Sequence, residues 1–136
     1  MSYGVSAALQ SAIYQALSAD TVLTGLVGSA IYDAAPTGSV PALYVSLGPE
    51  DVADASDQTG HGARHDFTVS VVSDTAGFLT AKQVAAAISD VLVDASLSLS
   101  RGRLVGLYFV SAKARRVQDS DVRRIDLKFR ARVEDS

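Results

Sequence analysis

Strict alternation of apolar and charged side chains near the C-terminus constrains the fold more than any other feature of this sequence. Between Val122 and Val133 the apolar positions are Ile125, Leu127, Phe129, Ala131 and Val133, and the charged ones are Arg124, Asp126, Lys128, Arg130 and Arg132. Successive side chains of a strand point to opposite faces, so the pattern predicts a strand with one buried face and one polar face. We therefore expect a sheet that is covered on one side only.

Further strands are predicted before this one. Residues 104–117 have strand character, and the polar sequence Gln118–Asp121 suits a tight turn, so the last two strands should form an antiparallel C-terminal β-hairpin. Earlier strands are predicted at residues 31–33, 41–47 and 63–72. Gly48 and Pro49 are expected to end the second of these, because glycine and proline punctuate strands.

Helical periodicity marks two longer segments. Apolar residues recur every four positions from Val5 to Leu17, and a second apolar stripe runs through residues 78–94. A short helix is predicted at residues 21–27, with Asp20 as its N-cap. The order of elements indicates an α+β fold, in which the N-terminal helix and the long helix pack on one face of a mainly antiparallel sheet.

The length of 136 residues suits a single domain with one core, spanning residues 1–136. We expect the matching periodicities of the long helix and two strands to meet in that core. The predicted core residues are Phe67, Val69, Val71, Ile88, Ile125, Leu127 and Phe129.

Residues 50–62 form the segment with the least predicted structure. They are small, polar and acidic, and Val52 is the only bulky apolar residue among them. This composition predicts a loop that is mobile in the free subunit and becomes ordered against a neighbouring molecule. The alternative is a surface loop without a role in assembly.

Charge is distributed unevenly along the chain. The net charge is −3, but residues 1–100 carry −8 and residues 101–136 carry +5. Two regions of opposite sign favour head-to-tail assembly of copies, although solvated strand faces also carry charge. The candidate assembly residues are Glu50, Asp51, Asp54, Asp57, Arg115, Arg116, Arg124, Lys128, Arg130 and Arg132.

Motifs for enzyme chemistry are missing from the sequence. Cysteine is absent, and there is no EF-hand loop, nucleophile elbow or phosphate-binding glycine loop. His61 and His65 would lie too far apart on a strand to chelate one ion, so we interpret them as surface polarity. We predict no catalytic, cofactor or metal site, and an enzyme with an unrecognised site is the alternative.

No apolar run reaches the length that spans a bilayer, and the first residues lack the pattern of a signal peptide, so the chain is expected to be made in the cytoplasm. The basic hairpin leaves a nucleic-acid-binding α+β module as another function. Proteins that bind single strands usually place aromatic side chains beside such charges. The outward face of the last predicted strand has none, because Phe129 falls on its buried face.

The sequence resembles the tail-terminator (tail-completion) family of long-tailed phages and gene transfer agents. The resemblance covers nearly the whole chain, and Ala42 and Leu43 depart from it by separating Pro41 from Tyr44. The segments that carry it are the helix Ala7–Leu17 with Leu23–Gly28, Ile31–Pro36, the strand from Pro41 through Val45, Phe67–Ser73 with Gly77, the helix Ala81–Leu92, the turn Leu99–Arg103 and the final hairpin.

This resemblance implies a structural virion protein rather than an enzyme. Members of the family cap the tail tube and form the tail side of the head–tail joint. The resemblance therefore implies a homo-oligomeric ring, expected to be a hexamer, that contacts the tail tube protein and a head–tail connector or stopper protein. DNA would pass through a central channel without sequence-specific binding, and the protein would reside in the tail of a phage or phage-like particle.

Overall fold

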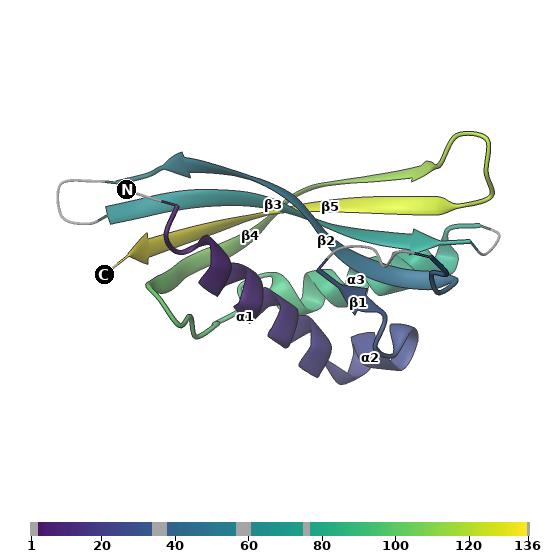
Figure 1. The fold of residues 1–136 in the computed structure, drawn as a ribbon, viewed down its shortest axis with the longest axis horizontal. Coiled ribbons are helices and arrows are strands. Elements are labelled where there is room, and N and C mark those ends of the chain that lie inside the picture. The colour runs from purple at the N-terminus through teal and green to yellow at the C-terminus, as the bar shows by residue number, and fades with distance from the viewer. Residues whose placement is uncertain (1–2, 34–37, 57–60, 75–76, 136) are drawn as a thin grey trace.

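The structure is a computed structural model that describes residues 3–33, 38–56, 61–74 and 77–135. Its helices and strands follow the predicted order closely (Figure 1). They are α1 (Ser6–Ala19), α2 (Thr21–Val27), β1 (Ile31–Tyr32), β2 (Leu43–Asp54), β3 (His61–Ser73), α3 (Leu79–Leu92), β4 (Arg103–Arg116) and β5 (Arg123–Asp135).

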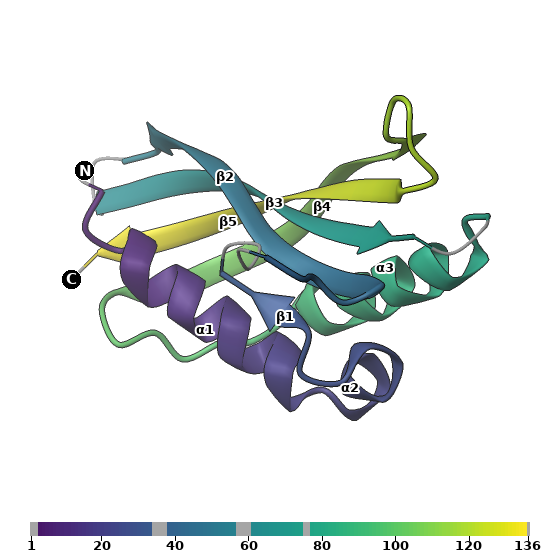
Figure 2. The same cartoon turned by 45° about the vertical axis from the view of Figure 1, so that its right-hand side comes forward.

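The strands form one five-stranded sheet in the order β1-β2-β3-β5-β4. Only the short β1 pairs in parallel, and all other neighbours are antiparallel. Figures 1 and 2 show α1, α2 and α3 on the same side of the sheet, so its other face is bare. The predicted α+β class, the helices on one face and the C-terminal hairpin are confirmed.

The core lies between the helices and the covered face of the sheet. All the predicted core residues are buried there, and Phe129 has no exposed surface. Its ring stacks 5.8 Å from that of Phe67 and meets the ring of Phe109 edge-on at 6.0 Å. The alternating residues of the last strand therefore point as predicted, with Leu127 and Val133 also buried.

The prediction of a loop over residues 50–62 is wrong for most of its length. Strand β2 continues past Gly48 and Pro49 through a bulge and pairs with β3 as far as the Asp54–Ala63 pair. Cross-strand pairing here outweighs a composition that disfavours strands. Proline is tolerated because β1 pairs with β2 only at Val45 and Ser46, so Pro49 lies where no described strand needs its N–H. Asp57 lies outside the described residues.

Candidate assembly surfaces

The bare face of the sheet carries most of the predicted basic residues. Side chains directly opposite one another in the register share a face, which assigns each charged residue to one side. Basic residues outnumber acidic ones on this bare face. They are Arg64, Arg103, Lys113, Arg115, Arg124, Lys128, Arg130 and Arg132, against Asp51, Asp66, Asp126 and Glu134.

Two partly buried carboxylates, Asp66 and Asp126, bind some of these arginines. Arg130 donates two hydrogen bonds to Asp66, at 2.8 and 3.1 Å, and these bonds lower the pKa of Asp66 below its ordinary value. Burial acts to raise the pKa of Asp126, but hydrogen bonds from Ser70 (2.6 Å) and Arg124 (2.9 Å) outweigh it, so the net pKa is lowered. The arginines at these sites are held at fixed positions on the face.

Other cations of the bare face lack such partners. Among the described residues, Lys113, Lys128 and Arg132 form no ion pair, and Lys128 and Arg132 are exposed. Tyr108 lies opposite Arg130 in the register and is 48% exposed. The ring of Tyr108, on β4, therefore lies beside the basic residues of the bare face, although β5 itself places no aromatic side chain there.

Glu50 serves the fold rather than a free surface. Its carboxylate accepts hydrogen bonds from the hydroxyls of Tyr3 and Ser6, and it lies 3.4 Å from Nδ1 of His65. His65 is completely buried, which corrects its interpretation as surface polarity. Burial acts to raise the pKa of Glu50, but the hydrogen bonds from Ser6, Tyr3 and His65 lower it below the ordinary value.

The other predicted acidic residues that the structure describes lie on β2. Asp51 and Asp54 are exposed near the end of β2, at the opposite side of the sheet from β4. Asp54 accepts a hydrogen bond from the Ser56 hydroxyl at 2.7 Å. Arg116 is exposed on β4, but the register places it on the helix-covered side, away from Arg115. Within one copy, Asp51 and Asp54 therefore lie away from the cations of β4, while Arg132 of β5 reaches the Ala55 carbonyl, next to Asp54, at 3.3 Å.

Four exposed apolar residues on β4 were not predicted from the sequence. Val105, Tyr108, Phe109 and Val110 are each between 39% and 48% exposed. The consecutive apolar residues Leu107–Val110 break the expected alternation, and this was the signal in the sequence. The register places Tyr108 on the bare side of the sheet and Phe109 on the helix-covered side, so this exposed apolar surface follows the edge strand rather than one face.

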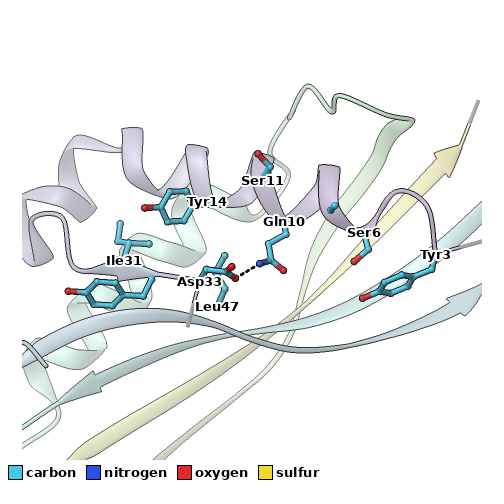
Figure 3. A pocket seen from close by; sticks show the side chains of 10 residues that line it. Tyr3, Ser6, Gln10, Ser11, Tyr14, Ile31, Asp33 and Leu47 are labelled. Carbon is cyan, nitrogen blue, oxygen red and sulfur yellow. Dashed lines mark hydrogen bonds between the residues drawn. The ribbon is translucent and has the colours of Figure 1, made fainter. Parts of the chain in front are cut away.

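A groove of about 660 Å³ lies between α1 and the strands β1 and β2. Figure 3 shows Gln10 and Tyr14 of α1 on the side of Asp33 and Ile31, with a hydrogen bond from Gln10 to Asp33. Hydroxyl groups of tyrosine and serine and the Asp33 carboxylate make its polar lining. The Asp33 carboxylate can accept a hydrogen bond from a donor or pair with a cation, and apolar side chains such as Ile31 and Leu47 make up the rest of the lining.

The described part of the chain can be compared with the requirements of a metal site and of a membrane-spanning helix. No His, Asp or Glu side chains gather there in a group that could hold a metal ion. None of its helices is long and apolar enough to cross a membrane.

This chain is similar to a known protein family and to a chain in a solved structure. Residues 11–134 match the family described as tail completion protein gp17. A chain in the solved structure "Virion of native gene transfer agent (GTA) particle" is 68% identical, with a TM-score of 0.92 over 98% of this chain and 99% of that one. No curated protein is matched. This chain therefore belongs to the tail completion protein gp17 family and is a structural protein of the virion tail.

Proposed function

We propose that the protein is a tail terminator, a ring that caps the tail tube and forms the tail side of the head–tail joint. The ring is a homo-oligomer, a hexamer by the family resemblance, with a central channel for DNA. Its neighbours are the tail tube protein on one side and a connector or stopper protein on the other. The mechanism is steric and interfacial, and it makes and breaks no covalent bond.

The observation that carries this proposal is the bare sheet face, which is long, basic and free of helices (Figure 2). Lys113, Lys128 and Arg132 form no ion pair among the described residues, so they can attract DNA phosphates. Contacts to the DNA backbone do not discriminate among bases, so this attraction does not depend on the base sequence. We assign this face to the channel. Family membership and the likeness to a chain of a gene transfer agent virion support the tail location.

Deletion of the gene in a particle-producing host tests the terminator role. Tubes without a cap should keep growing, so electron microscopy is expected to show tails of variable length without heads. Expression of the wild-type chain in trans should restore uniform tails. Normal tails with attached heads in the deletion strain would contradict the proposal.

Native mass spectrometry of the purified protein, at several concentrations, tests the ring. A closed oligomer in solution, or decoration of isolated tube ends, is the expected result. A strict monomer at high concentration that also fails to decorate tube ends would overturn the assignment.

Tyr108 beside Arg130 favours one second candidate, a nucleic-acid-binding module that acts outside the tail. The two functions differ in what the free subunit does. A module binds short DNA tightly as a monomer, with affinity that falls steeply as salt rises. A channel subunit needs the assembled ring to surround DNA, so its monomer should bind weakly.

A further inference from the structure

Strands β2 and β4 each leave a length of sheet edge uncovered. Strand β1 pairs with β2 only at Val45 and Ser46, and no other described strand covers β2 from Leu47 to Asp54. At the opposite edge, the N–H of Asp94 donates to the Leu107 carbonyl of β4 at 3.1 Å. Beyond Leu107, all of β4 is exposed as far as Arg116. Uncovered edges are templates for pairing with another chain.

The charges of these two edges are complementary. The β2 edge exposes Asp51 and Asp54 and carries no basic residue, whereas the β4 edge from Phe109 carries Lys113, Arg115 and Arg116 and no acidic one. Two edges of the same sign would repel, but these attract when they come from different copies. The exposed Phe109 and Val110 add apolar surface to the basic edge.

We propose that the β4 edge of one copy, residues 109–116, pairs with the β2 edge of the next copy, residues 50–54. This inference rests on the ring proposed above and identifies its subunit interface. The contact is heterologous, since it joins two different surfaces, and it closes only when the last β4 edge meets the first β2 edge. Closure covers both of these edge segments in every copy at once.

The direction of pairing follows from the topology. Strand β4 is antiparallel to β5, β5 to β3 and β3 to β2, so β4 runs antiparallel to the β2 of its own copy. Rotation about a ring axis lying roughly along the strands preserves strand direction. The β4 strand of one copy therefore also runs antiparallel to the β2 strand of its neighbour. Pro49, which has no N–H, limits the paired part of β2 to the residues after it.

The groove beside α1 receives the end of the incoming strand. Asp51 and Lys113 both lie on the bare side of their sheets, so antiparallel pairing can place them opposite each other. Arg116 then comes near Leu47, on the helix-covered side, where the groove opens. Its guanidinium meets the Asp33 carboxylate, which Gln10 already holds in place.

Disulfide cross-linking in assembled particles tests this interface, because the natural chain has no cysteine. Asp51→Cys is combined in three separate variants with Ser111→Cys, Lys113→Cys or Arg115→Cys, which share the bare side and scan the register. Cysteines on paired strands lie within disulfide distance. The control combines Asp51→Cys with Gln83→Cys on the exposed face of α3.

One register should give oxidised multimers up to the full ring on a non-reducing gel, while the control stays monomeric. If particles form normally but none of the three cysteine pairs cross-links, the proposed interface is wrong, whereas the terminator role is unaffected. If particles assemble normally without this protein, both the proposed terminator function and the proposed subunit interface are wrong.

Charge reversal tests the groove separately. Asp33→Arg and Arg116→Asp should each lower the yield of rings at least several-fold, and the double variant should restore it. If cross-links form but the double variant fails to recover rings, Arg116 does not enter the groove.

Discussion

Glu50 links three parts of the molecule through one carboxylate. Tyr3 and Ser6 belong to the start of the chain, and His65 belongs to the buried side of β3. A carboxylate at the first turn of α1 is also favoured by the partial positive charge of a helix N-terminus. The residue therefore holds α1 against the sheet, and this contact forms one wall of the groove.

Leu127→Ala tests the register of the last strand at the level of one side chain. Leu127 is 4% exposed, so its truncation should lower the free energy of unfolding by about 2–5 kcal/mol. The adjacent Lys128→Ala is the control, because Lys128 is exposed and should change stability by less than about 0.5 kcal/mol. Urea unfolding measures both. Equal effects would mean that Leu127 does not face the core.

Asp66 should make stability depend on pH. Its pKa is lower in the folded chain than in the unfolded one, so the native state binds fewer protons. The stabilisation is complete above the ordinary aspartate pKa of about 3.9 and is lost as pH falls through the lower, folded value. Because Arg130 is 40% exposed, the gain at neutral pH is below about 1 kcal/mol.

Asp66→Asn should therefore flatten the decline in stability between about pH 5 and pH 2, followed by urea unfolding across that range. Arg130→Gln removes the other partner and should flatten it similarly, while the double variant adds little further change. Additive effects would show that the two residues act independently.

Among the elements, the turn into β4 depends most on one backbone conformation. Gly102 has a φ of +70°, and a Cβ there would lie 2.5 Å from the Glu134 carbonyl oxygen. The turn brings the end of the α3–β4 connection against β5, so both β4 and the C-terminal strand rely on it. Arg101 and Arg103 flank the glycine and pair with Asp135 and Glu134, each at 2.7 Å.

Gly102→Ala should lower the free energy of unfolding by at least about 1–2 kcal/mol, the cost of a left-handed backbone at a residue with a side chain. Gly25→Ala is the matched control. It lies inside α2, where a Cβ meets nothing within 4 Å, so the change should stabilise the chain by up to about 1 kcal/mol. Thermal unfolding of the two variants should shift in opposite directions, and a shared direction would contradict this account.

At the scale of the whole molecule, one layer of helices leaves a complete sheet face open. The hydrophobic core lies on the opposite side of the sheet. Substitutions on the bare face should therefore change the free energy of unfolding little. Its charges are therefore available for function. The partly buried carboxylates Asp66 and Asp126 fix some arginines, and other cations have no ion pair among the described residues.

A variant with Lys128→Gln and Arg132→Gln, two cations of the bare face that lie on β5 and outside the proposed subunit interface, should separate assembly from DNA passage. If the bare face lines the channel, particles should form with normal tails but deliver DNA at least several-fold less efficiently, because the phosphates lose their counter-charges. The comparison is Arg101→Gln, a cation of the turn outside this face. Unchanged delivery by the double variant would place the face elsewhere in the particle.

Local pattern determined most of the fold. The two-residue period from Ile125 to Val133 and the four-residue period of α1 each require only that one side of an element be buried. Those periods predicted the helices, the hairpin and the core residues around Phe129 without knowledge of their neighbours. The same element order predicted the family.

Tertiary structure alone decided the roles of Glu50, His65 and the β4 edge. Composition predicts a loop at residues 50–54, but pairing with the long β3 strand supplies the backbone hydrogen bonds that those small polar residues need. His65 is buried because Tyr3 and Glu50, distant in sequence, meet it in space. Which edges of the sheet stay open depends on strand order, and strand order arises from contacts between distant segments that no local pattern records.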